Sequence, residues 1–157
     1  ALFVRPARRG APPLLALEGW NDAGEAATMA VRYVADHLGC APLAEIDCEE
    51  FFDFTVERPQ TGFGEDGARR VEWPHTVFRY GSMDPAREIV LGFGPEPHLR
   101  WRRYSDCVLR LVRCLAVRRV VLLGAYLADV VYSRPVGVSG ISSDPGVLGP
   151  EGVATSH

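Results

Sequence analysis

The chain contains no lysine, and all 17 of its basic residues are arginine. This absence excludes catalysis through a lysine Schiff base and phosphate binding by a lysine-containing loop. The four cysteines form no CxxC pair and the histidines show no His–x–x–His spacing, which argues against a metal site. We therefore interpret the cysteines as reduced thiols of a cytoplasmic protein and expect no cofactor.

Long hydrophobic runs are also missing. No apolar stretch approaches the about 20 residues of a membrane helix, and residues 1–13 lack the apolar core of a signal peptide. The net charge of −3, from 17 basic and 20 acidic residues, creates no overall field that attracts nucleic acid or acidic lipid. We expect neither a membrane nor a nucleic-acid partner. A GxSxG nucleophile motif is absent as well, so no catalytic residue is assigned and enzymatic activity stays an open question.

The residues that are present are typical of a globular α/β domain. Leu14–Trp20 is an apolar run, the loop 19–24 follows it, and apolar residues then recur at helical spacing as far as Leu38. This segment predicts a buried strand, a glycine-bounded loop and a helix. We treat residues 1–157 as a single α/β domain and expect the protein to continue beyond its loop-like C-terminal residues.

The second half of the chain repeats this order. Glu88–Phe93 predicts a buried strand, His98–Val117 a helix, and Arg119–Leu123 a further buried strand. Two strand–loop–helix units separated by a more irregular insert predict an α/β layered fold with a mostly parallel sheet.

The insert has a different character. Residues 50–56 are rich in aromatic side chains and are expected to be extended, whereas 58–70 hold several glycines and predict a surface loop or hairpin tip. Arg69–Trp73 and Thr76–Tyr80 flank a proline, and we expect them to pair as antiparallel strands.

The loop 19–24, of sequence GWNDAG, has two interpretations. A loop between a strand and a helix N-terminus is a common site for an anion or a small ligand. Alternatively, Asp22 and Glu25 form a capping box, in which Asp22 accepts the first helical N–H groups and Glu25 reaches back. A carboxylate in that position repels phosphate, so the capping interpretation weakens the phosphate hypothesis. Asn21, the only asparagine of the chain, lies in the same loop.

A second cluster follows the strand of the other half. Seven arginines and one acid, Asp106, fall between Arg100 and Arg119, with Trp101 available for stacking. The helical spacing places most of these arginines opposite the apolar stripe, which favours a solvated face or an oligomer surface over a nucleic-acid site. Glu96 and Arg100 are considered separately, because we expect a loop at a strand end to hold both near GWNDAG. An Arg–carboxylate pair in such a place is usually structural.

A third segment follows the last predicted strand and contains Asp129 and Arg134. Because carboxyl ends of parallel strands meet at one edge of a sheet, we expect both side chains near Asn21 and Asp22. Such a group of acids, amide and arginines suits acid–base work or simply ties three loops together. The candidate residues for ligand or partner contact are Gly19, Trp20, Asn21, Asp22, Gly24, Glu25, Glu96, Arg100, Trp101, Asp129 and Arg134.

Several strings of the chain together resemble a known family. In order, they are LLALEGWNDAGEAA, AEIDCEEFFDFTVERP, RRVEWP, GPEPHLRWR, LLGAYLADVVYSRPV and SSDPGV. They resemble the actinobacterial branch of the proteasome assembly chaperone family, of the chaperone-two type. The resemblance implies a three-layer α/β/α domain similar to nucleoside phosphorylases and related hydrolases, and assembly into oligomers. Eukaryotic relatives help to assemble the proteasome α-ring, whereas the bacterial members have no settled activity.

Two functional hypotheses follow. The first is a non-enzymatic, chaperone-like homo-oligomer that binds proteins such as proteasome subunits. Its contacts would use aromatic residues in or beside loops, namely Trp20, Trp73 and Trp101. The alternative for these tryptophans is partial burial in the core. The second is a binding protein or hydrolase for a nucleoside-like or amide molecule, in which Arg100 holds an anionic group, Asp129 is an acid or base, and Asn21 orients the substrate.

Overall fold

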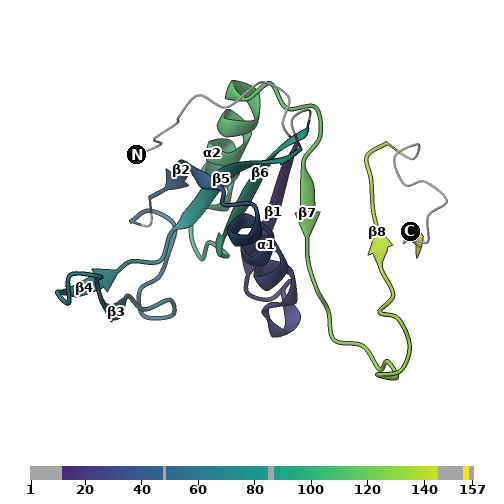
Figure 1. The fold of residues 1–157 in the computed structure, drawn as a ribbon, viewed down its shortest axis with the longest axis horizontal. Helices are drawn as coiled ribbons and strands as arrows, with labels where there is room; N and C mark the ends of the chain where they lie inside the picture. The colour runs from purple at the N-terminus through teal and green to yellow at the C-terminus, as the bar shows by residue number, and fades with distance from the viewer. Residues whose placement is uncertain (1–11, 48, 85–86, 145–153, 156–157) are drawn as a thin grey trace. The chain divides into compact units, whose positions relative to one another are not determined.

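The computed structural model describes residues 12–47, 49–84, 87–144 and 154–155. The chain forms two compact units, residues 1–126 and residues 127–157, which are described separately. The first unit is built on a five-stranded sheet of order β2-β5-β6-β1-β7 (Figure 1). Its elements are β1 (Pro13–Glu18), α1 (Ala26–His37), β2 (Ala41–Ile46), β5 (Thr76–Asp84), β6 (Arg87–Pro95), α2 (Trp101–Cys114) and β7 (Val121–Leu123), with a short 3-10 turn, η1 (Ala23–Glu25), before α1.

The predicted α/β class is confirmed, but the sheet is mixed rather than mostly parallel. β1 pairs in parallel with β6 on one side and with β7 on the other. β5 pairs antiparallel with both β6 and β2. The reason is the short connection between β5 and β6, whose register runs as far as Asp84 opposite Arg87; a parallel pair would require a long crossover.

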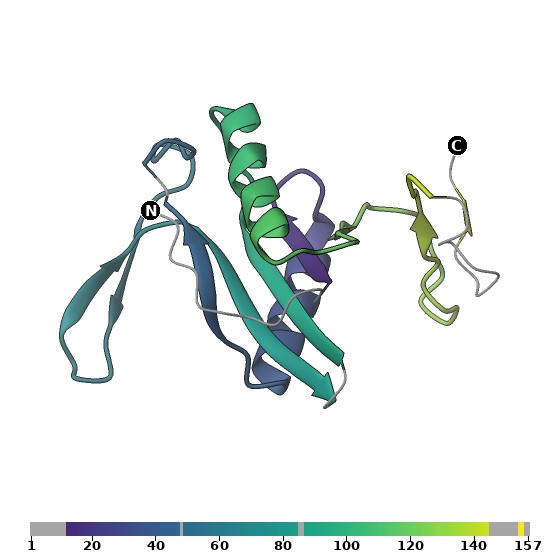
Figure 2. The same ribbon diagram turned by 90° about the horizontal axis from the view of Figure 1, so that it is seen from above.

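One helix packs on each face of the sheet, as the two views show (Figures 1 and 2). Neighbouring residues of a strand point to opposite faces. Leu15 of β1 therefore joins a core cluster with Leu111 of α2, whereas Ala16 joins a second cluster with Val31 of α1. Full burial of one such aliphatic side chain contributes about 1.5–3 kcal/mol, so the two clusters hold α1 and α2 against opposite faces.

The insert departs from two predictions. Residues 50–56 form turns rather than an extended segment, because the Phe51 carbonyl accepts the N–H groups of His98 and Leu99 while its ring enters the α2-side core. The strand at Arg69–Glu72, β4, pairs with β3 (Gln60–Phe63) rather than with β5. Both edges of β5 are already taken by β2 and β6, so the hairpin forms its own two-stranded sheet.

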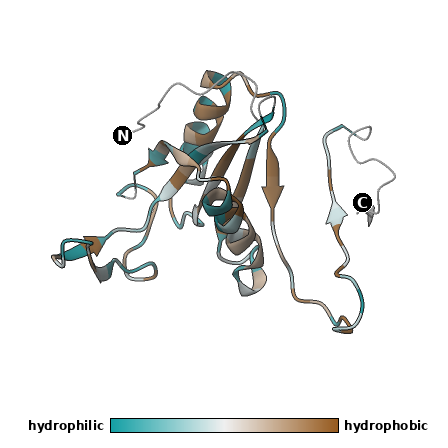
Figure 3. Cartoon of the chain, viewed as in Figure 1, coloured by the Kyte–Doolittle hydropathy of each residue, from teal (hydrophilic) through white to brown (hydrophobic). Residues whose placement is uncertain are grey.

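β7 also differs from expectation. It was expected to be buried, but Leu122 is 69% exposed and Val121 is exposed as well. β7 is an edge strand whose ladder in the described residues is with β1, and its colouring in Figure 3 marks it as hydrophobic. Only its last residue, Leu123, packs against the α1-side core cluster.

The second unit contains a short parallel pair, β8 (Ser139–Gly140) with β9 (Ala154–Thr155). None of the helices described in the structure is long and apolar enough to cross a membrane. Three of the four cysteines, Cys40, Cys107 and Cys114, are free thiols, and Cys48 lies outside the described residues.

Candidate functional site

The carboxyl ends of β1 and β6 form a topological switch point. The two strands are parallel neighbours, yet the chain leaves β1 for α1 on one face of the sheet and leaves β6 for α2 on the other. The two loops that follow them therefore diverge and leave a crevice between them. Ligands of open α/β proteins bind in such a crevice.

An open groove lies at this position. Residues from the end of β1, from the loop before α1, from the turn after Phe54 and from the end of β6 line it. They are Glu18, Gly19, Trp20, Asp22, Gly24, Glu25, Val56, Glu57, Pro95, Glu96, Pro97 and His98. Six of the predicted candidates are thus brought together: Gly19, Trp20, Asp22, Gly24, Glu25 and Glu96.

The carboxylate of Asp22 organises the loop from inside. Asp22 is 4% exposed, and its Oδ1 accepts the N–H of Ala27 at 2.7 Å while its Oδ2 accepts the N–H of Thr28 at 3.0 Å. The Thr28 hydroxyl donates to the same Oδ2. These are N–H groups of the first turn of α1, which lack partners within the helix. The expected capping role of Asp22 is confirmed, although it acts from before η1 rather than from the residue next to the helix.

The reciprocal half of the capping box is not formed. The N–H of Asp22 donates to the Gly19 carbonyl at 3.1 Å, and Glu25 makes no side-chain capping hydrogen bond. Glu25 has a left-handed backbone, with φ of 56°, which follows Gly24 at φ of 64°. The two positive φ values turn the chain into the helix and direct Glu25 toward the groove instead of back toward Asp22.

Glu96 joins the two loops that flank the groove. Its N–H donates to the Glu18 carbonyl at 2.8 Å, and its Oε2 accepts the N–H of Trp20 at 3.2 Å. Gly19 is required between them: its φ is +139°, and a Cβ there would lie 2.7 Å from Oε2 of Glu96. The close approach of the two loops therefore depends on a residue without a side chain.

The third side of the loop is tied to the segment after β7. Ala125 donates its N–H to the Asn21 carbonyl at 2.9 Å and accepts the N–H of Ala23 at 3.0 Å. The Asn21 side chain lies at Gly124, where a Cβ would come within 2.5 Å of its Nδ2. Asn21 thus faces β7 and, among the residues that the structure describes, is outside the groove lining.

The backbone around Trp20 is fixed, yet its side chain is 93% exposed. Hydrogen bonds hold the residue before it, its own N–H and the two residues after it. The indole is therefore presented to solvent from a well-anchored loop, at the rim of the groove.

Arg100 and Trp101 are not among the described residues that line the groove. Arg100 has a left-handed backbone, with φ of 51°, and its Nη1 lies 3.2 Å from Oε2 of Glu50. Arg103 contacts the same oxygen at 2.8 Å. The Arg–carboxylate pair considered for Glu96 is thus made with Glu50. Trp101 is half-exposed on the first turn of α2.

The groove is acidic. Its lining contains four glutamates, namely Glu18, Glu25, Glu57 and Glu96. The basic side chain in the lining is His98. Arg32 pairs with Glu18 from α1. The His98 ring is fixed, because its Nδ1 accepts the N–H of Asp53 at 3.3 Å. An anionic ligand would meet several carboxylates here, so the charge disfavours phosphate.

Asp129 and Arg134 belong to the second unit, so their place near the groove stays a prediction. Sequence reasoning missed Glu18, Val56, Glu57, Pro95, Pro97 and His98 as lining residues. The positions of Glu18 and Pro95 at the ends of parallel strands could have indicated them. Val56 offered no such signal, because residues 50–56 were expected to be extended, and Glu57 lies directly after that segment. Within the described ranges, no group of three or more His, Cys, Asp or Glu side chains is placed to hold a metal ion.

A buried tyrosine anchors the first turn of α2. The Tyr104 hydroxyl lies 2.8 Å from Oγ1 of Thr76, and its ring packs edge-on against Phe51 at 5.5 Å between centroids. Burial raises the pKa of Tyr104 to about 12, although the hydrogen bond with Thr76 acts in the opposite direction.

These features define an α/β protein with an acidic groove at the switch point of a mixed sheet. The chain matches the PAC2 family over residues 16–155, and it belongs to that family. It is 35% identical to a PAC2 family protein from Streptomyces avermitilis, with a TM-score of 0.78, over 87% of this chain and 59% of that one. It is 38% identical to a proteasome-assembly chaperone homologue from Mycobacterium tuberculosis, with a TM-score of 0.79, over 91% of this chain and 61% of that one.

These matches confirm the family resemblance seen in the sequence. An archaeal proteasome activator from Pyrococcus furiosus shares the fold at 18% identity, with a TM-score of 0.61, over 83% of this chain and 52% of that one. The chain spans 59% and 61% of the lengths of the Streptomyces and Mycobacterium relatives. A comparison with curated proteins found no match.

Replacement of the capping carboxylate, Asp22→Ala, should destabilise the protein by about 2–3 kcal/mol, because two buried N–H groups and the Thr28 hydroxyl lose their acceptor. Urea unfolding measures the change. Asp106→Ala, on the exposed face of α2, is the matched control and should cost less than about 0.5 kcal/mol. Equal effects of the two substitutions would contradict the role assigned to Asp22.

The buried tyrosine should make stability fall at alkaline pH. The unfolded chain releases the Tyr104 proton near pH 10.0, the ordinary pKa of tyrosine, whereas the folded protein keeps it until about pH 12. The contribution to stability is therefore complete below pH 10 and is lost as the pH rises to 12. The loss amounts to about 2–3 kcal/mol. In unfolding experiments from pH 8 to 12, Tyr104→Phe should lower the stability at pH 8 and flatten this decline; an unchanged decline would refute the assignment.

Proposed function

We propose that this PAC2 family chain is part of a non-enzymatic, chaperone-like protein that binds other proteins through the surface around Trp20. It assembles as a homo-oligomer in the cytoplasm, and its partners include proteasome subunits. The likeness to a proteasome-assembly chaperone homologue supports the class of partner. The similarity to nucleoside phosphorylases that the family resemblance implies stays part of this proposal, and a likeness of fold carries no chemistry by itself.

The observation that carries the proposal is the exposure of Trp20 on an anchored loop. A folded protein gains almost nothing in stability from a tryptophan that buries so little of its surface. A binding surface gains more, because tryptophan is enriched among the residues that dominate interface energies. The hydrogen bonds of the loop reduce the conformational entropy that binding would otherwise remove.

Trp20→Ala should weaken the capture of purified proteasome subunits by the full-length protein about 30-fold, the effect of losing an interface residue worth about 2 kcal/mol. Titration in a surface-based or calorimetric binding assay measures the change. The melting temperature should stay that of the parent protein, because Trp20 is 93% exposed.

Tyr33→Ala is the matched control. Tyr33 is a 70%-exposed aromatic residue on the outer face of α1, remote in sequence from the loop, and its replacement should leave the affinity unchanged. No binding by the parent protein, or equal losses in the two variants, would contradict the proposal.

A second candidate function rests on a separate observation, the groove at the switch point of β1 and β6. In this alternative the chain binds or hydrolyses a nucleoside-like or amide molecule. Asn21 and Arg100 contact Gly124 and Glu50 rather than the groove, so their assigned roles lose support, and Asp129 stays the proposed acid or base.

The alternative predicts that neutral nucleosides or small amides raise the melting temperature of the full-length protein. A ligand at 100 times its dissociation constant adds about 2.7 kcal/mol. Inorganic phosphate should give no shift, because the lining contains four glutamates. Asp129→Asn would test the acid–base role: unchanged turnover of a ligand identified in this way would exclude it.

A further inference from the structure

The β3–β4 hairpin has a free strand edge. In the described residues, β3 and β4 pair with each other and with no other strand (Figure 1). The hairpin projects from the central sheet, and an isolated two-stranded hairpin is only marginally stable in water. A free edge also offers unpaired N–H and C=O groups to another strand.

The hydrogen bond at the hairpin tip shows which groups of β4 point outward. The N–H of Gly64 donates to the Ala68 carbonyl at 2.9 Å, so these two residues form a hydrogen-bonded pair. Pairs of this kind alternate along an antiparallel ladder. Arg70 opposite Gly62 is therefore the next one, and the N–H and C=O groups of Arg69 and Val71 face away from β3.

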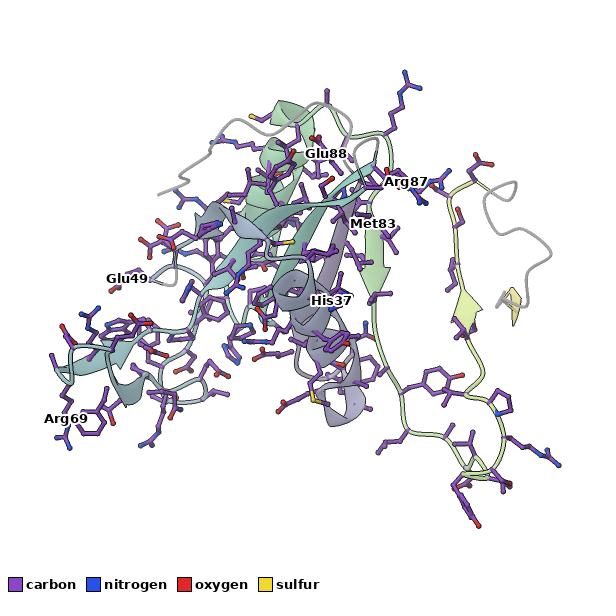
Figure 4. The ribbon with its side chains drawn as sticks, in the orientation of Figure 1. His37, Glu49, Arg69, Met83, Arg87 and Glu88 are labelled. Atoms are coloured by element: carbon purple, nitrogen blue, oxygen red, sulfur yellow. The ribbon has the colours of Figure 1, made fainter. Side chains whose placement is uncertain are left out.

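The side chains of β4 alternate between the two faces of the hairpin. Val71 and Arg69 share one face with Phe63, and the Arg69 guanidinium lies 5.8 Å from the Phe63 ring centroid. Phe63 is 75% exposed and Val71 is 55% exposed. Arg69 lies at the outside of the hairpin, where Figure 4 labels it. Arg70 and Glu72 share the other face.

We propose that β4 pairs antiparallel with β4 of a second copy of this chain, across a two-fold axis at Val71. The outward N–H and C=O of Val71 then bond to those of Val71 of the partner subunit. Arg70 lies opposite the partner subunit's Glu72, and the symmetry creates this ion pair twice. The product is a four-stranded antiparallel sheet made from two hairpins, an isologous contact that closes on itself.

The charges select this register. Shifting one β4 strand along the other by a single residue would put side chains of opposite faces next to each other, because side chains alternate with a period of two. The other symmetric registers have the two-fold axis at Arg70 or at Glu72. Centring the pair on Arg70 would place arginine opposite arginine, and centring it on Glu72 would place glutamate opposite glutamate. Like charges directly opposite each other are destabilising. The register centred on Val71 alone pairs opposite charges.

Arg70 can make the new contact. Its present ion pair with Asp66, at 2.8 Å, is 63% and 57% exposed at the two side chains, and pairs of this kind contribute little. A strand of four residues buries less than the about 1,000 Å² of a stable interface, so the expected dimer dissociates at roughly micromolar concentration. The inference deepens the oligomer part of the proposed function and does not involve Trp20.

Sedimentation velocity of the full-length protein over a range of concentrations provides the test, with Val71→Pro as the first variant. Proline removes the outward N–H of residue 71 without breaking a bond of the hairpin itself, so dimerisation should weaken at least about tenfold. Thr61→Pro is the matched control, because Thr61 lies opposite Val71 and its N–H faces outward from β3. It should leave the dimer intact.

A charge exchange makes the test independent of folding. Glu72→Arg alone should weaken the dimer, because it places two arginines opposite each other at each pair. Adding Arg70→Glu to the same chain restores opposite charges and should restore the dimer. A monomer at every concentration, equal effects of the two proline variants, or no rescue by the exchange would overturn the proposal. Binding of proteasome subunits is measured on the same variants. If Val71→Pro still binds them, a failure of the dimer proposal leaves the proposed function of the Trp20 surface intact.

Discussion

The buried carboxylate of Asp22 is the interaction on which the candidate site depends. It accepts hydrogen bonds from two N–H groups and one hydroxyl of the first turn of α1, and so fixes where the helix begins. Because the N–H of Asp22 also closes the turn to Gly19, the same residue determines the path of the loop. The Trp20 side chain on this loop is 93% exposed. One capped helix thus positions both the rim of the groove and the exposed indole.

The sequence pattern predicted the parts of the site that depend on local chemistry. The apolar run before Gly19, the capping role of Asp22 and the helix after it all follow from residues within a few positions of one another. What it did not predict depends on distant segments. The sheet is mixed because β5 pairs antiparallel with β6. Arg100 contacts Glu50, which lies in a turn of the segment that was expected to be extended. Periodicity carries no information on such pairings.

The position of the groove and the kind of ligand it can bind have different origins in this chain. Its place at the switch point follows from topology and is shared by many α/β proteins with different functions. Its chemistry comes from the side chains that line it: four glutamates beside an exposed tryptophan, with Arg32 paired to Glu18. The partial positive charge at a helix N-terminus would attract an anion, but the Asp22 carboxylate already occupies that position in α1. The usual anion-binding property of this position is therefore used internally.

Two of the elements in the first unit that carry exposed apolar side chains, the Trp20 loop and the β3–β4 hairpin, differ in how firmly they are held. The Trp20 loop is anchored at both ends and by Ala125, so a partner would meet a surface that needs little ordering. The β3–β4 hairpin has only its own ladder in the described residues, and a second strand pair would stabilise it as well as bind it. Binding at the first element leaves the fold as it is, whereas pairing at the second completes a sheet. The two contacts would therefore respond to different substitutions, and one can be lost while the other persists.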